Sequence, residues 1–337
     1  MNITECRSEN GFSVKLQIIM SEIKKNNVSV VIPVYNGADT VIPLTERLLH
    51  VLPEEFRFYE IIFVDDCSPD NSWNVLKDLQ IKNPETIRVI HLARNFGQHN
   101  ATLCGIRAAK YEICVTMDDD LQHPPEQLHL LIEELEKGYD VVYAIPKKMP
   151  HSWWRNLGSK MAKLILSKIM GIPIREIGAF RAFRTNLRNA FENYQSPEVC
   201  IDPLLTWGTK KFSHVYVEED KREIGKSNYS MSTLIKTTIM VMTRYSTVPL
   251  RFASMLGFVF MLFGIAVLIY VLTVTFSLGS IPGFPFLASI ISIFAGVQLF
   301  TLGIFGEYLA RIYERSNDRP PYVVWEDSND TQEKNEQ

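Results

Sequence analysis

The chain has 337 residues, of which 35 are Lys or Arg and 38 are Asp or Glu, so its formal net charge is −3. A charge this close to zero gives no indication of a nucleic-acid partner. The five cysteines form no Cys-x-x-Cys pair and do not cluster with histidines, which argues against a zinc site.

The first 145 residues alternate between short apolar runs and helical patterns. Residues 1–27 form an N-terminal extension, in which an apolar patch interrupted by Lys15 is too short for a secretory signal. The alternation that follows predicts an α/β fold, a mainly parallel sheet with helices on both faces. The predicted strands are 28–35, 60–64, 86–92, 112–117 and 140–144, and the predicted helices are 38–51, 69–81, 98–110 and 124–136.

Polar residues follow four of the predicted strands, at 33–37, 65–68, 93–97 and 118–120. In parallel sheets, ligands bind beyond the carboxyl ends of the strands, so these residues are expected to converge at one rim. No G-x-G-x-x-G follows the first strand and no G-x-x-x-x-G-K-[ST] occurs, which argues against a dehydrogenase-type dinucleotide fold and against a P-loop. A metal and basic side chains are therefore expected to hold any phosphates.

The run Asp118-Asp119-Asp120 is the strongest candidate site. Three consecutive carboxylates repel one another unless a cation lies among them. Asp118 and Asp120 can face one centre while Asp119 points away, and a hard divalent ion with free positions for phosphate oxygens suits such ligands. The alternative is a solvated acidic turn or helix N-terminus.

Two amphipathic segments follow the regular alternation. Residues 152–170 combine tryptophans, aliphatic residues at helical spacing and interspersed Lys and Arg, which favours a helix lying on a membrane surface. A helix packed in the core is the alternative reading. Residues 230–250 predict a second, juxtamembrane helix.

Residues 252–306 contain no charged side chain. A break at 279–285 divides them into two runs, about 255–275 and 286–306, each long enough to cross the ~30 Å hydrocarbon core. Basic residues precede the first run and follow the second, so the positive-inside rule predicts that both ends are cytoplasmic. We expect a multi-pass inner-membrane protein with a cytosolic domain at 28–229 and a cytosolic tail at 311–337 that is disordered at its end.

Five motifs together resemble glycosyltransferase family 2 enzymes of the GT-A fold, and specifically the polyprenyl-phosphate glycosyltransferases. The resemblance covers about residues 28–315, including the apolar hairpin. The motifs are VVIPVYN at 30–36, VDDCSPD at 64–70, RNFG at 94–97, DDDLQHPPE at 118–126 and REIGKSNY at 222–229.

The resemblance implies roles for individual residues. Mg²⁺ or Mn²⁺ would be held by Asp118, Asp120 and Gln122. The nucleotide donor would be bound by Pro33, Tyr35, Asn36, Asp65, Asp66, Arg94, Asp118 and Asp119. The acceptor phosphate would be bound by Arg181, Arg222, Lys226 and Ser227, although 222–227 could also be a solvated basic loop. Asp120, Arg222 and Lys226 are the expected catalytic residues.

Two positions depart from the family pattern. Relatives usually carry an acidic residue where this chain has Gly37, which we expect to alter ribose recognition. Many have Asp in place of Ala179, a position associated with a catalytic base. An acceptor phosphomonoester has a second pKa near 6 and needs little proton removal at pH 7, so positioning and charge stabilisation become the main requirement.

The expected reaction is inverting transfer of a hexosyl group from a nucleotide sugar, UDP-linked rather than GDP-linked, to undecaprenyl phosphate or a similar polyprenyl phosphate. The expected partners are this donor, this acceptor and the lipid bilayer, with a homo-oligomer, a tetramer by resemblance, also possible. Two alternatives are a processive polysaccharide synthase of the same fold and an inactive membrane scaffold. Processive synthases usually carry a Gln-x-x-Arg-Trp motif, which this sequence lacks. The complete set of expected metal ligands, Asp118, Asp120 and Gln122, argues against an inactive scaffold.

Overall fold

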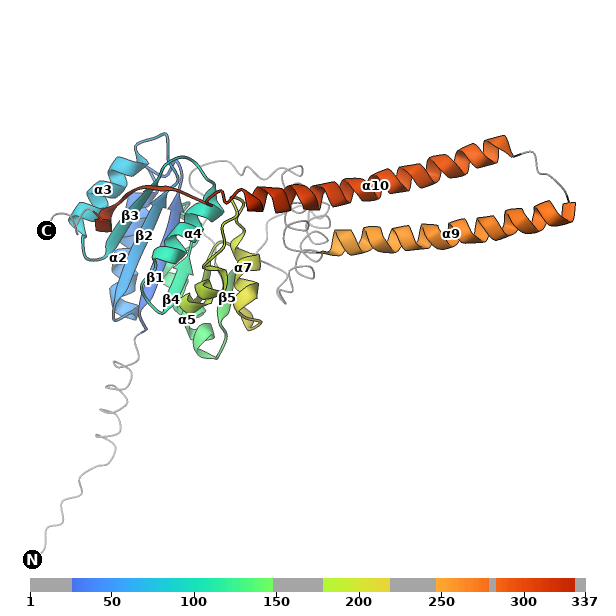
Figure 1. Cartoon of the computed structure of the whole chain (residues 1–337). Coiled ribbons are helices and arrows are strands. Elements are labelled where there is room, and N and C mark those ends of the chain that lie inside the picture. The colour runs from blue at the N-terminus through green and yellow to red at the C-terminus, as the bar shows by residue number, and fades with distance from the viewer. Residues whose placement is uncertain (1–25, 148–177, 219–246, 279–282, 331–337) are drawn as a thin grey trace, which may run out of the picture. The chain divides into compact units, whose positions relative to one another are not determined.

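The structure is a computed structural model that describes residues 26–147, 178–218, 247–278 and 283–330. The chain divides into two compact units, each of which is described by itself. The first contains a mixed sheet with its helices, and the second contains two long C-terminal helices (Figure 1). The amphipathic segment 152–170, most of the juxtamembrane segment 230–250 and the basic loop 222–227 lie outside the described residues.

All five predicted strands are confirmed, with boundaries that differ by one or two residues. They are β1 (Val28–Val34), β2 (Tyr59–Asp65), β3 (Ile87–Leu92), β4 (Ile113–Thr116) and β5 (Val141–Pro146). Every residue of β1 and β4 is buried. Strands covered on both faces need continuous apolar runs, which is why these segments show no alternation of polar and apolar residues.

The order of the described strands is β7-β5-β6-β4-β1-β2-β3-β8. β1 pairs in parallel with β2 on one side and with β4 on the other. The chain thus continues from β1 to β2 and β3 in one direction and returns to β4 on the opposite side. This reversal creates a topological switch point, where the carboxyl ends of neighbouring strands leave room for a ligand.

Helices cover both faces of the sheet (Figure 1). Residues of α2 (Val41–Glu55), α3 (Ser72–Lys82) and α5 (Leu128–Glu136) share one core with Val30 and Ile32 of β1. α5 directly follows a short 3-10 turn, η1 (Pro125–Gln127). The opposite face of β1 meets α4 (Gln98–Ala108), where a Cβ added to Gly105 would collide with Val31. A glycine at 105 therefore allows α4 to approach the sheet closely.

Three strands were not predicted from the sequence. β6 (Arg181–Arg184) inserts antiparallel between β4 and β5, and it is followed by η2 (Thr185–Phe191) and α7 (Ile201–Gly208). β7 (Phe212–Val217) pairs in parallel with β5. These pairings make the sheet mixed, while the strands around the switch point are parallel.

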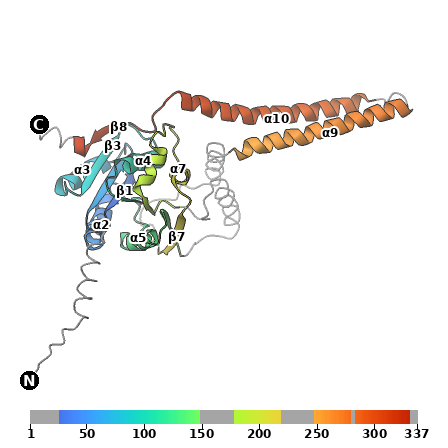
Figure 2. The same cartoon turned by 60° about the horizontal axis from the view of Figure 1, so that its bottom comes forward.

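The third of these, β8 (Val324–Asp327), lies within the tail at 311–337, whose last residues, 331–337, are outside the described residues. It pairs antiparallel with β3 at the edge of the sheet (Figure 2). The Arg88 guanidinium donates to both carboxylate oxygens of Asp327, at 3.1 and 2.6 Å, and the backbone N–H of Val89 donates to Ser328 Oγ at 3.1 Å. The unpaired backbone N–H and C=O groups of an edge strand readily pair with further strands. The pairing with β8 provides partners for such groups on the outer edge of β3.

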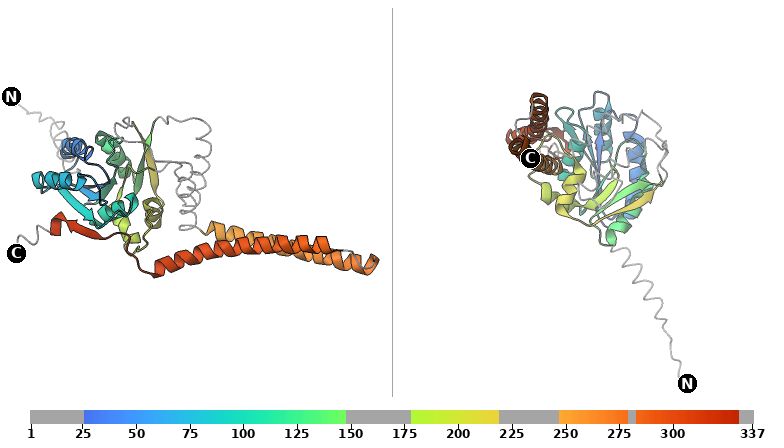
Figure 3. Two further views of the ribbon diagram at one scale, coloured as in Figure 1. Left: turned by 90° about the horizontal axis from the view of Figure 1, so that it is seen from above. Right: turned by 90° about the vertical axis from the view of Figure 1, so that its right-hand side faces the viewer.

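The second unit contains α9 (Val248–Leu278) and α10 (Phe284–Ser316), which lie side by side (Figure 3). The rings of Phe260 and Phe294 meet edge to face, with their centroids 6.1 Å apart. Both helices are long and apolar enough to cross a membrane, with candidate spans Val248–Val274 and Ile293–Ser316. The two predicted apolar runs therefore form the two helices of a hairpin, and α10 extends beyond the predicted end at 306.

Candidate functional site

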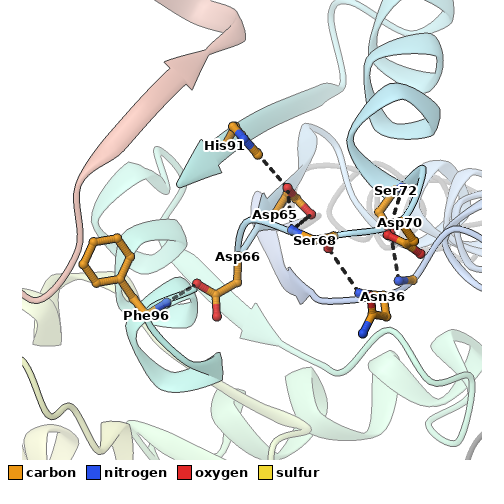
Figure 4. Close-up of polar contacts among 9 residues, drawn as sticks. Asn36, Asp65, Asp66, Ser68, Asp70, Ser72, His91 and Phe96 are labelled. Atoms are coloured by element: carbon orange, nitrogen blue, oxygen red, sulfur yellow. Dashed lines mark hydrogen bonds and ion pairs between the residues drawn. The ribbon is translucent and has the colours of Figure 1, made fainter. Parts of the chain in front are cut away.

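The loop that follows β1 is held by side chains from the loop that follows β2 and from the first residue of α3 (Figure 4). The N–H of Asn36 donates to Ser68 Oγ at 3.1 Å, and the N–H of Gly37 donates to Ser72 Oγ at 2.9 Å. Asp70 accepts from the N–H of Ala38 at 3.2 Å and from that of Ser72 at 3.1 Å. Burial opposes ionisation of Asp70, but these hydrogen bonds hold its pKa below the usual value. The rim is fixed before any ligand arrives.

Three non-glycine residues at this rim have left-handed backbone conformations. They are Asn36 (φ 58°), Cys67 (φ 55°) and Leu121 (φ 61°), and they lie just beyond β1, β2 and β4. Such conformations cost energy and are retained where the surrounding structure enforces them, often at functional sites. Their position at the carboxyl ends of three adjacent strands indicates a built binding site.

Asp65, predicted to line the nucleoside pocket, is fully buried at the end of β2. One of its carboxylate oxygens lies 2.7 Å from His91 Nδ1, and the His91 ring stacks on Trp73 with centroids 4.6 Å apart. Asp65 also accepts the N–H of Ser68 at 3.3 Å. It therefore connects the carboxyl ends of β2 and β3, and a direct contact with a base stays a prediction.

Asp66 is buried and holds the start of α4 (Figure 4). Its two carboxylate oxygens accept the N–H groups of Phe96 and Gly97, each at 2.7 Å. Burial raises the pKa of Asp66 and these hydrogen bonds partly offset it. Both oxygens have backbone partners, so Asp66 fixes the loop between β3 and α4 at the rim. Arg94, on the loop between β3 and α4 that also carries Phe96, is exposed. Its guanidinium carbon lies 4.3 Å from the centroid of the Phe96 ring.

The acidic run follows β4, directly beside the loop after β1. Asp118 accepts a hydrogen bond from Gln98 Nε2 at 2.5 Å, and Asp120 accepts from the N–H of Gln122 at 3.1 Å. Burial, reinforced by the charges of Asp118 and Asp120, raises the pKa of Asp119 to about 7. Carboxylates that interact this strongly are ready to accept a cation.

The side-chain oxygens of the acidic run are suitable ligands for a hard divalent cation. No group of three or more His, Cys, Asp or Glu side chains suited to a metal occurs among the described residues. The predicted set contains two carboxylates and one amide, Asp118, Asp120 and Gln122, all of which offer oxygen. A site of this kind leaves positions for phosphate oxygens and water, as Mg²⁺ and Mn²⁺ sites do.

Arg181 corrects one prediction. It lies on β6 with 2% of its surface exposed, and its guanidinium forms an ion pair with Asp202 of α7. Its Nε donates to Thr116 Oγ1 at 3.0 Å, and Asp202 also accepts from the Tyr143 hydroxyl at 2.9 Å. A guanidinium already neutralised inside the domain is not placed to bind an acceptor phosphate. It anchors the end of β4 instead.

The structure thus brings the predicted donor and metal residues to one rim, beyond β1, β2, β3 and β4. Pro33 is buried within β1, while Tyr35 and Asn36 are exposed in the loop that follows. Arg222, Lys226 and Ser227 lie outside the described residues. Sequence reasoning missed the partners of the site: Gln98, Asp70, Ser72, His91 and Asp202. A carboxylate amid the apolar run Ile201–Leu205 is the one signal that could have indicated a buried ion pair.

Known proteins resemble the chain over most of its length. It is 34% identical over 310 residues to the undecaprenyl-phosphate 4-deoxy-4-formamido-L-arabinose transferase of Proteus mirabilis, covering 90% of this chain and 95% of that protein. The transferase of the same name from Edwardsiella ictaluri is 32% identical over 301 residues, covering 88% and 93%.

A solved structure also resembles this one. It is glucosyl-3-phosphoglycerate synthase from Mycobacterium tuberculosis, with a TM-score of 0.46 and 16% identity, covering 67% of this chain and 81% of that chain. The model of the family "Glycosyl transferase family 2" matches residues 29–194, which span β1 to η2. Together with the two relatives and the GT-A-like mixed sheet, this match identifies the chain as a glycosyltransferase that belongs to glycosyl transferase family 2.

Proposed function

We propose that the protein transfers a glycosyl group from a nucleotide sugar to undecaprenyl phosphate or a similar polyprenyl phosphate, at the cytoplasmic face of a membrane. The observation that carries the proposal is the match, over about 90% of the chain, to relatives named as undecaprenyl-phosphate transferases. Two helices apolar enough to cross a membrane agree with a lipid acceptor.

The donor site lies at the switch point between β1 and β4. The loops after β1 and β2 receive the nucleoside, and Asp118, Asp120 and Gln122 hold Mg²⁺ or Mn²⁺ beside the diphosphate. When bound, such an ion offsets negative charge on the leaving nucleoside diphosphate. Ser68 and Ser72 accept hydrogen bonds from the loop after β1, and Gln98 donates one to Asp118, so the loops and carboxylates are held in place and little reorganisation is required during the reaction.

The acceptor phosphate supplies the nucleophile. A lipid phosphomonoester is largely dianionic at pH 7, so its oxygen attacks the anomeric carbon without a strong base, and Ala179 in place of an acidic residue is no obstacle. Arg222, Lys226 and Ser227 are proposed to bind this phosphate and orient it. Attack from the face opposite the leaving group inverts the anomeric configuration.

The sugar is proposed to be a hexose carried by UDP. The relatives named above act on a formamido-L-arabinose, a pentose derivative, which makes a UDP-linked pentose of this kind the second candidate donor. A processive synthase is less well supported because the sequence has no Gln-x-x-Arg-Trp motif.

Nucleotide release from a panel of UDP- and GDP-sugars tests the proposal. The full-length protein in detergent is assayed with and without undecaprenyl phosphate, in Mn²⁺, in Mg²⁺ and in EDTA. Release from one donor that requires both lipid and metal is expected. Metal-dependent nucleotide binding with no release from any donor would contradict lipid-phosphate transfer, and no nucleotide binding at all would favour the inactive-scaffold alternative.

A further inference from the structure

His91 and Asp65 are direct neighbours across two parallel strands. The register of β2 and β3 sets Asp65 opposite His91, and on the other side of β3 His91 lies opposite Glu326 of β8. His91 is thus part of a strand that is paired on both sides. Its Nδ1 lies 2.7 Å from Asp65 Oδ2. A carboxylate oxygen accepts, so the imidazole Nδ1–H donates this hydrogen bond.

The direction of this donor is fixed by a second contact. The His91 ring stacks on Trp73 of α3, with centroids 4.6 Å apart and an angle of 27° between the ring planes. The side chain of His91 is 19% exposed and that of Asp65 is fully buried. A buried carboxylate that loses a donor is costly, because water cannot replace the hydrogen bond. Stacking and strand pairing therefore present Nδ1–H to Asp65 in one orientation.

Asp65 transmits this constraint to the rim. Its carboxylate oxygens accept the backbone N–H of Ser68 at 3.4 and 3.3 Å, and Ser68 Oγ in turn accepts the backbone N–H of Asn36 at 3.1 Å. Figure 4 shows His91, Asp65, Ser68 and Asn36 joined in this order. The loop after β1 is therefore connected to β3 through the loop after β2.

Both loops need to be held, because each contains a residue in the left-handed region. Asn36 has φ 58° and Cys67, which directly precedes Ser68, has φ 55°. Such conformations persist where the surrounding structure enforces them. Tyr35, next to Asn36, is 48% exposed and is expected to line the nucleoside pocket. Release of Ser68 would let both loops relax away from the shape that they have at the rim.

We infer that His91 is a positioning residue of the donor site, which acts through Asp65 and Ser68 to hold the loops after β1 and β2 in the conformation that receives the nucleoside. This inference rests on the proposed nucleotide-sugar site. A ligand that requires one loop conformation binds more weakly in proportion to the fraction of protein that has left it. The metal ligands expected on the loop after β4 lie outside this series of contacts, so metal affinity should not depend on His91.

Three substitutions separate the N–H donor of His91 from the packing of its ring. His91→Phe keeps a ring that can stack on Trp73 and removes the donor. His91→Asn removes the ring and places an amide N–H near the position of Nδ1, whereas His91→Gln places the same amide one carbon farther out. His214→Phe is the matched control, because His214 is an exposed strand histidine with its own ring contact, to Tyr216, on β7 at the opposite edge of the sheet.

The experiment uses the full-length protein in detergent. Calorimetry measures the affinity for UDP in Mn²⁺, with GDP if UDP does not bind, and the affinity for Mn²⁺ alone. Hydrogen–deuterium exchange follows residues 35–38 and 66–70 in the ligand-free protein. His91→Phe and His91→Gln are expected to bind the nucleotide about 10-fold more weakly, the loss typical of a hydrogen bond to a charged group, and to exchange faster in both loops. His91→Asn and His214→Phe should resemble wild type, and Mn²⁺ affinity should be unchanged in all four variants.

The outcomes separate this inference from the proposed function. Wild-type nucleotide affinity in His91→Phe overturns it, because the donor would then be dispensable. An Asn variant as weak as the Phe variant also overturns it, since the ring and not its N–H would be required. If His91→Phe is too unstable to purify, the comparison of Asn with Gln decides. Absence of nucleoside diphosphate binding in wild type would remove the proposed function, and the exchange rates would still decide whether His91 holds the loops.

Discussion

The guanidinium of Arg181 on β6 pairs with the carboxylate of Asp202 on α7 in the interior of the sheet unit. Both residues are buried, with 2% and 7% of their surfaces exposed. Through Thr116, the same guanidinium contacts the end of β4, immediately before the acidic run. The pair thus connects the added strand β6 with the strand that presents the metal ligands.

Removal of one partner of this pair should destabilise the protein strongly. Arg181→Met leaves the Asp202 carboxylate buried without its counter-charge, which typically costs about 3–5 kcal/mol. The double variant Arg181→Met/Asp202→Asn removes both charges and keeps an acceptor for the Tyr143 hydroxyl, so a smaller loss is expected. Thermal and denaturant unfolding of the full-length protein in detergent measure both. An Arg181→Met protein of wild-type stability but raised KM for the lipid phosphate would instead support the acceptor-binding role.

Asp120→Asn should lower nucleotide release by at least about 100-fold, because an amide is a poor ligand for a hard cation and metal-assisted charge stabilisation is lost. The unfolding temperature should change little, since Asp120 is partly exposed in a loop and the substituted amide keeps an oxygen that can accept the N–H of Gln122. Asp78→Asn, which changes an exposed carboxylate on α3, is the control. An unchanged rate in Asp120→Asn would remove its metal role.

The stability of the metal-free protein should fall as pH rises from about 4 toward 7. The pKa of Asp119 is raised from 3.8 to about 7 in the folded protein, so the folded state binds this proton more tightly than the unfolded state. The resulting stabilisation is complete below the unfolded pKa and is lost as pH passes the folded pKa, a change on the order of a few kcal/mol.

Unfolding in EDTA at pH 5 and pH 8 checks this sign. Asp119→Asn cannot ionise, so its stability relative to wild type should be greater at pH 8 than at pH 5. A variant that shifts stability equally at the two pH values would show that Asp119 does not titrate between them.

A chain that ends after Arg319 lacks β8 and should be less stable and more prone to aggregation. Its loss exposes the edge of β3 and leaves Arg88 without Asp327. A chain that ends after Asp330 keeps the β8 contacts of the described residues and serves as the control. Unfolding temperature and light scattering distinguish the two, and equal behaviour would mean that β8 contributes nothing to the sheet.

The sequence predicted the elements around the switch point well, because β1 to β5 are buried apolar runs separated by amphipathic helices. β6 was not predicted because it has only four residues and both its first and its last residue are arginines, Arg181 and Arg184. A buried arginine reads as a surface residue unless its partner is known, and Asp202 lies 21 residues away. The same limitation led to the phosphate role predicted for Arg181.

β8 was missed for a different reason. It is short and acidic, its Trp325 is 75% exposed, and it follows two prolines, so nothing in its pattern indicates a strand. Its pairing depends on an open edge that only the three-dimensional arrangement provides. In the site, the metal and nucleotide residues were found through motifs, whereas the hydrogen bonds that hold them depend on loops meeting in space. The departure at Gly37 is visible in the sequence, whereas the closeness of the Asp119 carboxylate, with which a Cβ at 37 would collide, arises only from the fold.

The position of β8 in the chain also bears on the order of biosynthesis. β3 ends at Leu92, whereas its edge partner begins at Val324, after both apolar helices. Domains begin to fold while the ribosome is still adding residues. The edge of β3 therefore stays open until α9 and α10 have been translated, so the sheet can be completed only after both apolar helices have left the ribosome.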